Sequence, residues 1–141
     1  MSDLYQAIIL DHNRRPRNFH VMEGATGREQ GVNPLCGDQF TVFVRLDGDV
    51  IAEASFQGSG CAISKASASM MTAMVTGKTR AEAESLFQQV HDLLVGKGDA
   101  TAESLGSLRA LGGVSRFPMR VKCASLPWHT LRGAIAASPP T

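Results

Sequence analysis

Apolar and polar residues alternate along the middle of the chain, and this alternation is its clearest structural signal. It runs through residues 40–45 and resumes through residues 50–57. Asp47-Gly48 between the two runs is a preferred sequence for a tight hairpin turn. The pattern therefore predicts two antiparallel strands joined by a hairpin, with a short edge strand near residues 26–30.

Apolar residues at helical spacing predict helices on both sides of this hairpin. Thr79-Arg80-Ala81-Glu82 is a capping-box sequence that would begin one of them, and Pro127 is expected to break or kink the last. Together these patterns predict both strands and helices in one chain. The expected helices cover residues 4 to about 12, 62–77, 80–95 and 105–111, followed by a last helical region through 126–135.

Length and charge limit the classes of protein to consider. A chain of 141 residues can bury one hydrophobic core, which predicts a single domain over 1–141 with a disordered tail at 138–141. The net charge of +1 gives no support to binding of nucleic acid or an acidic membrane surface. No apolar run approaches the roughly 20 residues that span a bilayer, and no signal pattern is present, so we expect a cytoplasmic protein.

The three cysteines are the main candidates for chemistry. Their odd number and the lack of a Cys-x-x-Cys pair argue against a secreted disulfide framework. Cys36 and Asp38 precede the first strand of the hairpin and Cys61 follows the second, so the topology brings these ends together. Cys123 lies far along the chain. Buried thiols, a reactive thiol and metal ligands all remain open at this point.

A shared metal site is one interpretation of these residues. Zinc in a structural site takes four ligands and favours thiolate, and Asp38 is the nearest candidate to complete a set with the three cysteines. Iron–sulfur clusters also use cysteine thiolates, sometimes with one other ligand. Arg120 and Lys122 flank Cys123 and could compensate negative charge. The spacing is not that of a zinc finger, so it does not decide between these alternatives.

Three segments around the cysteines resemble the signatures of the U-type iron–sulfur cluster assembly proteins, the IscU and NifU N-terminal-like family. The segments are Asn33–Asp38, Phe56–Ser64 and Arg120–Ala124, the last followed by Leu126-Pro127-Trp128. Pro16-Arg17-Asn18 also resembles the N-terminal segment of that family. The resemblance covers nearly the whole chain.

Two features resemble the SufU branch of the family. The IscU branch carries a histidine directly before the third cysteine, where this chain has Lys122. The segment between the helix after Cys61 and Cys123, which includes residues 96–113, is also longer than in that branch. An ammonium group is a poor metal ligand, so Lys122 argues against the scaffold chemistry of the IscU branch.

The resemblance implies a SufE/NifU-like α+β domain, in which a small antiparallel sheet of about three strands is packed by several α-helices. It also implies zinc held by Cys36, Asp38, Cys61 and Cys123. It also implies a zinc-dependent sulfurtransferase in which Cys36 accepts persulfide sulfur from a SufS-type cysteine desulfurase. That partner would carry the pyridoxal phosphate, and downstream iron–sulfur scaffold proteins would receive the sulfur. Arg120 and Lys122 are then candidates for docking or charge compensation.

Two other functions remain as alternatives. The chain could be a scaffold on which an iron–sulfur cluster, or iron, is bound, assembled and transferred to apo-proteins. It could also be a structural zinc module whose cysteines carry no sulfur.

Overall fold

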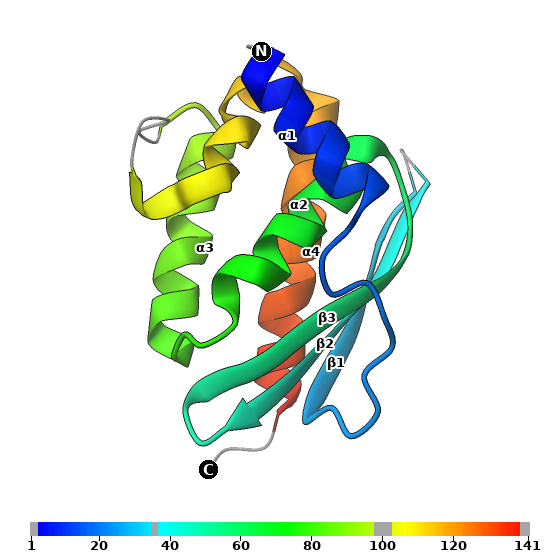
Figure 1. The fold of residues 1–141 in the computed structure, drawn as a ribbon, viewed down its shortest axis with the longest axis vertical. Coiled ribbons are helices and arrows are strands. Elements are labelled where there is room, and N and C mark those ends of the chain that lie inside the picture. Colours follow the sequence, from blue (N-terminus) through cyan, green and yellow to red (C-terminus); the bar gives the residue numbers. More distant parts are fainter. Residues whose placement is uncertain (1–2, 35–36, 98–102, 139–141) are drawn as a thin grey trace.

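A computed structural model describes residues 3–34, 37–97 and 103–138 (Figure 1). Within these ranges the chain forms helices that pack on one side of a three-stranded antiparallel sheet, so the predicted α+β class is confirmed. No helix in these ranges is both long and apolar enough to cross a bilayer. The elements in chain order are α1 Asp3–Arg14, β1 Gly27–Asn33, β2 Asp38–Asp47, β3 Val50–Ser59, α2 Ala62–Val75, α3 Arg80–Leu94, the 3₁₀ segment η1 Glu103–Arg116, and α4 Pro118–Ala137.

The sheet has the strand order β1-β2-β3, and its register decides which residues meet at each end. Asp47 pairs with Val50 around the predicted hairpin turn, where Gly48 has a φ of +63°. At the other end of the sheet Asn33 pairs with Asp38, and Gln39 pairs with Ser59. The end of β1, the start of β2 and the end of β3 therefore lie side by side.

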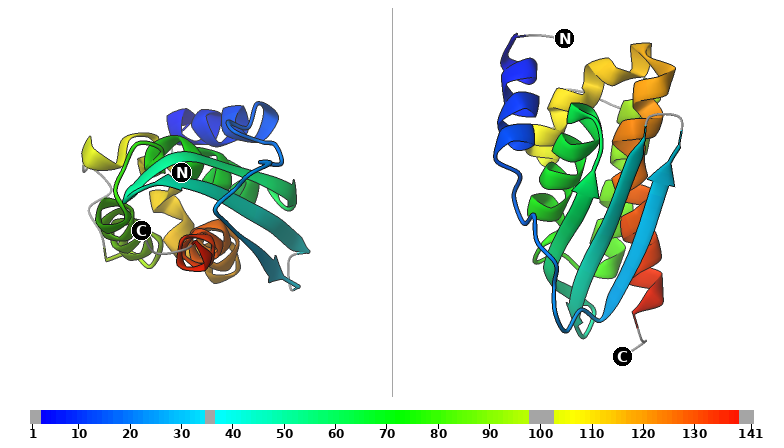
Figure 2. Two further views of the ribbon diagram at one scale, coloured as in Figure 1. Left: turned by 90° about the horizontal axis from the view of Figure 1, so that it is seen from below. Right: turned by 90° about the vertical axis from the view of Figure 1, so that its right-hand side faces the viewer.

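The core lies between the sheet and the helices, with α2 and α4 against the strands (Figure 2). Phe40, Val42 and Val44 of β2 are completely buried, as their alternation predicts. Trp128 of α4 is also buried, and its indole N–H donates to the Ser67 hydroxyl of α2 at 3.2 Å. The small hydroxyl residues of α2 thus let two helices approach closely while keeping buried polar groups paired.

The N-terminal helix is anchored to α2 by a buried histidine. The Nδ1 atom of His12 lies 2.7 Å from the Ser69 hydroxyl, which also accepts the Arg17 backbone N–H at 2.8 Å. Burial lowers the pKa of His12 below its ordinary value, which favours the neutral ring, and the unprotonated Nδ1 of a neutral ring can accept a hydrogen bond from the Ser69 hydroxyl. This contact fixes the segment that precedes β1.

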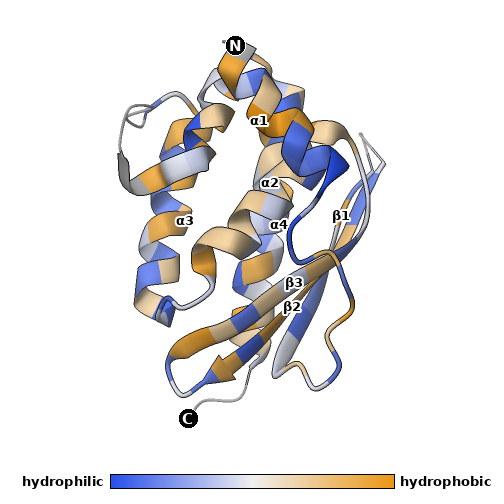
Figure 3. Cartoon of the chain, in the orientation of Figure 1, coloured by the Kyte–Doolittle hydropathy of each residue, from blue (hydrophilic) through white to orange (hydrophobic). Residues whose placement is uncertain are grey.

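Strand β1 lies directly on α4 because glycine takes the place of a side chain at the contact. A Cβ atom on Gly31 would collide with Thr130 Oγ1, and one on Gly27 would collide with the Ala134 carbonyl oxygen. β1 is also the most hydrophilic strand (Figure 3). Close backbone packing, more than apolar side chains, therefore holds this strand in place.

Replacing Gly31 with alanine should lower the free energy of unfolding by about 2 kcal/mol, because the new methyl group overpacks the β1–α4 contact. Urea unfolding would measure the change. Gln30→Ala on the same strand removes an exposed side chain and is the matched control. Equal stability of the two variants would show that β1 can move away from α4.

Three expectations need correction. Of the break or kink expected at Pro127, the break does not occur, since α4 continues through this residue. The Ser67 hydroxyl donates to the Ala124 carbonyl in that turn at 2.6 Å. The expected helix at 105–111 is a longer 3₁₀ segment, interrupted at Gly106 by a φ of +52°. Ser138 is buried and its hydroxyl lies 3.3 Å from the Ala134 carbonyl oxygen, so it is not part of a disordered tail. Residues 139–141 are outside the described ranges.

Candidate metal centre

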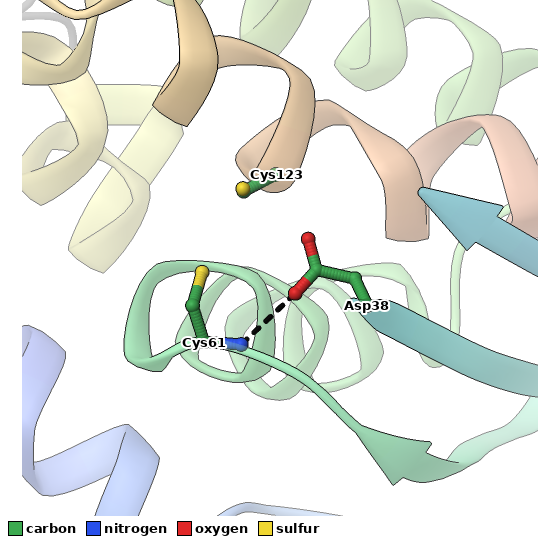
Figure 4. Close-up of side chains that lie close together, drawn as sticks. All are labelled: Asp38, Cys61 and Cys123. Carbon is green, nitrogen blue, oxygen red and sulfur yellow. Dashed lines mark hydrogen bonds between the residues drawn. The ribbon is translucent and has the colours of Figure 1, made fainter. Parts of the chain in front are cut away.

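Asp38, Cys61 and Cys123 converge at the end of the sheet where β1 ends and β2 begins. One carboxylate oxygen and the two sulfur atoms lie within 4.8 Å of one another. The residues come from three elements: the first position of β2, the N-cap of α2 and the second turn of α4 (Figure 4). The fold thus joins residues that are 85 positions apart in sequence, from Asp38 to Cys123.

Asp38 is completely buried, yet only one of its carboxylate oxygens has a protein partner in the part of the chain that the structure describes. Oδ1 accepts the Cys61 backbone N–H at 2.9 Å and the Ser64 hydroxyl at 3.1 Å. Oδ2 is buried without a hydrogen-bond partner among those residues. Burying a carboxylate oxygen in this way is costly unless a cation or a donor meets it.

The position of Cys61 follows from its role in starting α2. It is the N-cap residue, with a φ of −69° and a ψ of 167°, and its sulfur accepts the Ser64 backbone N–H at 3.4 Å. Its side chain is half-buried. The backbone geometry of a helix start therefore directs this sulfur toward Asp38.

Cys123 supplies the second sulfur from the opposite side of the site. Its side chain is 3% exposed, and the Asn33 side-chain amide donates to its sulfur at 3.9 Å. Asn33 is the last residue of β1 and is itself buried. Both described sulfur atoms therefore accept a hydrogen bond from the chain.

This donor set fits a thiophilic divalent cation. Two sulfurs and a carboxylate oxygen are ligand types that zinc takes in tetrahedral sites. As thiolates and a carboxylate they carry a formal charge of −3, which a divalent cation would reduce to −1. The unpartnered Oδ2 of Asp38 supplies the structural reason for a cation here.

Cys36, the predicted sulfur acceptor and fourth ligand, lies outside the described residues. Its neighbours Pro34 and Gly37 are described and exposed, and Gly37 has a φ of +72°. The sequence places Cys36 two positions before Asp38, in the connection from β1 to β2. Its assignment as a ligand remains a prediction.

Arg120 and Lys122 are exposed on the first turns of α4, close in sequence to Cys123. The Arg120 guanidinium carbon lies 5.6 Å from the centroid of the Phe117 ring. Lys122 is exposed although the next residue along the helix, Cys123, is buried. Among the described residues neither side chain forms an ion pair with Asp38, and their docking role remains a prediction.

The sequence interpretation did not assign roles to Asn33, Gly60 or Ser64, although all three stand within the cysteine segments. A signal existed for Ser64, which is three residues after the N-cap Cys61 and so faces it on the first helical turn. Asn33 and Gly60 act through contacts between strands and helices. Contacts between residues so far apart in sequence produce no pattern among neighbouring residues from which they could be predicted.

Gly60→Ala should lower zinc content without unfolding the protein. A Cβ at this position would lie 2.6 Å from both Asp38 Oδ1 and Ser64 Oγ and 2.9 Å from the Phe40 ring. The carboxylate would have to shift, which disturbs the ligand geometry. Elemental analysis would measure zinc, with exposed Ser59→Ala as control; equal zinc in both variants would contradict this role of Gly60.

Comparison with known proteins tests the predicted family. Residues 4–124 match the family model described as NifU-like N terminal domain. The chain belongs to this family. The predicted relationship to the U-type iron–sulfur assembly proteins is therefore confirmed.

Two relatives show the range of names within the family. A Bacillus subtilis protein named zinc-dependent sulfurtransferase SufU is 41% identical over 136 residues, covering 96% of this chain and 92% of the relative. A Streptococcus pyogenes protein named iron–sulfur cluster assembly scaffold protein IscU is 38% identical over 138 residues, covering 98% and 86%.

Solved structures agree with the fold. A Fervidobacterium islandicum protein described as a putative iron–sulfur cluster assembly scaffold for the SUF system has a TM-score of 0.85 and 36% identity, with 96% of each chain covered. A NifU-like N-terminal protein from Brucella abortus has a TM-score of 0.87 at 20% identity, covering 96% of this chain and 94% of that one. The latter similarity concerns the fold alone.

Proposed function

We propose that this protein is a zinc-dependent sulfurtransferase of iron–sulfur cluster assembly, in which Cys36 accepts sulfur. The buried, unpartnered Oδ2 of Asp38 beside the sulfurs of Cys61 and Cys123 is the observation that carries the proposal. The similarity to a relative named zinc-dependent sulfurtransferase supports it. The geometry calls for a thiophilic cation, and the name of that relative favours zinc over an iron–sulfur cluster or iron.

Asp38, Cys61 and Cys123 would hold the zinc ion, with Cys36 as fourth ligand. When bound, zinc would keep the sulfur ligands in the thiolate form and make the bound thiolates less open to stray oxidants. Within the chain, the Cys61 backbone N–H and the Ser64 hydroxyl orient the Asp38 carboxylate. Burial of Cys123 keeps water and reagents away from that sulfur.

The transfer step uses the thiolate of Cys36. This thiolate attacks the terminal sulfur of a persulfide on the partner's cysteine. A bond forms between the Cys36 sulfur and that terminal sulfur as the sulfur–sulfur bond of the partner's persulfide breaks. The partner's cysteine leaves as a thiolate, and the persulfide now stands on Cys36. No external oxidant or reductant is required, because the sulfane sulfur only changes its carrier.

Cys36 is the proposed acceptor because the other two cysteines are anchored at helices, Cys61 as the half-buried N-cap of α2 and Cys123 as a buried residue of α4. Cys61 caps α2 and Cys123 is 3% exposed, whereas Pro34 and Gly37 on either side of the 35–36 connection are exposed. A SufS-type cysteine desulfurase with pyridoxal phosphate is the proposed donor, and downstream iron–sulfur scaffold proteins are the proposed recipients. Arg120 and Lys122 are exposed near this end of the fold and are proposed to dock the donor.

Mass spectrometry of the protein after incubation with a SufS-type desulfurase and cysteine would test the transfer. The proposal predicts one added sulfur atom on the peptide that contains Cys36. Sulfur found only on Cys61 or Cys123, or on none of the three, would overturn it.

A scaffold function is the second candidate, since several relatives are named as scaffolds. It predicts that anaerobic reconstitution gives a stable cluster, which transfers to an apo-protein faster than free iron and sulfide do. Exposed Lys122 beside Cys123 disfavours it, because an ammonium adds no ligand to the site.

A further inference from the structure

The side chain of Asn33 reaches the sulfur of Cys123 across 90 residues of sequence. Its Nδ2 atom lies 3.9 Å from the sulfur, within hydrogen-bond range for the larger sulfur atom. Only 8% of Asn33 is exposed, although it stands at the end of a strand whose middle residues are mostly exposed. A buried amide at such a position calls for a partner, and Cys123 provides it.

The backbone holds this amide in place from two sides. Asn33 pairs with Asp38 in the sheet register, so it is tied to the residue that supplies the carboxylate of the metal centre. Two residues earlier, Gly31 sits against Thr130 of α4, the helix that carries Cys123. The end of β1 therefore cannot easily move relative to Cys123.

The chemistry of the two groups is complementary. A thiolate accepts hydrogen bonds and cannot donate them, whereas an amide NH₂ offers two donors. A hydrogen bond to a thiolate stabilises its charge and makes the sulfur a weaker nucleophile. Groups that hydrogen-bond to metal ligands also fix their orientation, and their loss typically weakens metal binding 10- to 100-fold.

We propose that Asn33 is a positioning residue that holds the Cys123 sulfur toward the metal and keeps it from reacting, so that sulfur is carried by Cys36 alone. The part concerning Cys36 rests on the proposed sulfurtransferase function; the part concerning zinc does not. Cys61 has the equivalent donor built into the backbone, the Ser64 N–H at 3.4 Å. For Cys123 the Asn33 side chain supplies a donor of this kind, from β1 rather than from the cysteine's own helix.

Zinc affinity and cysteine reactivity test this assignment without any partner protein. Asn33→Ala removes the amide, and Asn33→Leu fills its volume without a donor. Competition with a chromophoric chelator should show zinc dissociation constants at least about tenfold higher in both variants. Iodoacetamide should alkylate Cys123 in the zinc-loaded variants and leave it intact in the parent protein. Gln30→Ala, an exposed amide on the same strand, is the matched control.

Unchanged zinc affinity together with an unreactive Cys123 in both variants would overturn the proposal. If the variants do not fold, the parent protein labelled with ¹⁵N and loaded with ¹¹³Cd gives the answer. A side-chain amide proton of Asn33 that is scalar-coupled to cadmium through the sulfur supports the hydrogen bond, and its absence overturns it. Failure of persulfide formation on Cys36 in the parent protein would reject the sulfurtransferase function and leave these measurements valid.

Discussion

Cys36→Ala is expected to abolish the activation of a SufS-type cysteine desulfurase by this protein. The variant lacks the thiolate that would attack the partner's persulfide, and we expect no substitute from the sulfurs of Cys61 and Cys123, which accept hydrogen bonds within the fold. Turnover of cysteine to alanine, followed with and without the variant, would measure the effect. We expect a loss of at least about 100-fold in the stimulated rate, typical of removing a nucleophile.

Zinc content must be measured on the same sample, because Cys36 is also a proposed ligand and its loss should lower zinc. Gln39→Ala, an exposed residue beside Asp38, should keep full activity and zinc. Full stimulation of the desulfurase by Cys36→Ala would contradict the proposed transfer, whatever its zinc content.

Asp38→Asn is expected to strip zinc from the protein and to lower its thermal stability while the fold remains. An amide oxygen can still accept the Cys61 backbone N–H, but it is a poor replacement for a carboxylate ligand. Zinc present at about 1,000 times its dissociation constant contributes about 4 kcal/mol to stability. Losing it should lower the melting temperature of a domain this size by about 15 °C, which differential scanning calorimetry would detect.

Two comparisons distinguish the stability that zinc contributes from the stability that the hydrogen bonds of the Asp38 carboxylate contribute. With excess chelator the parent protein and Asp38→Asn should melt at similar temperatures, because the difference depends on zinc. Asp38→Ala should be less stable still, since the Cys61 N–H then lacks its buried acceptor. A gap between the parent protein and Asp38→Asn that persists in chelator would show that zinc is not its cause.

Much of the fold could be predicted because its signals are local. The hairpin follows from alternation on either side of Asp47-Gly48, and the start of α3 follows from reciprocal hydrogen bonds between Thr79 and Glu82. Each signal depends on residues within a few positions of one another. Turn formation and helix capping of this kind depend little on the rest of the chain, so they can be predicted from short segments of sequence.

The errors arose where tertiary contacts override local preference. A proline inside a helix usually disrupts it, but α4 packs against the sheet and α2, and the Ser67 hydroxyl donates to the Ala124 carbonyl three residues before Pro127. Ser138 stands before two prolines, yet its hydroxyl meets Ala134 and Thr26. Neither contact can be recognised from the residues near it in sequence.

The sequence led to three residues that the structure brings together, Asp38, Cys61 and Cys123, but not to the contacts that support them. Hairpin topology brings Asp38 and Cys61 together, the preference of zinc for thiolates suggested Cys123 as a further ligand, and the resemblance to a known family strengthened that interpretation. The contact between Asn33 and Cys123 joins β1 to α4, so it required the folded chain. The unpartnered Oδ2 of Asp38 is likewise visible only in three dimensions.

The most direct test of the metal centre is X-ray absorption at the zinc edge of freshly purified protein. We predict one zinc ion with three sulfur ligands at about 2.3 Å and one oxygen ligand at about 2.0–2.2 Å, from the cysteines and Asp38. A zinc ion surrounded only by nitrogen and oxygen, or a sample with iron and acid-labile sulfide in place of zinc, would contradict the account.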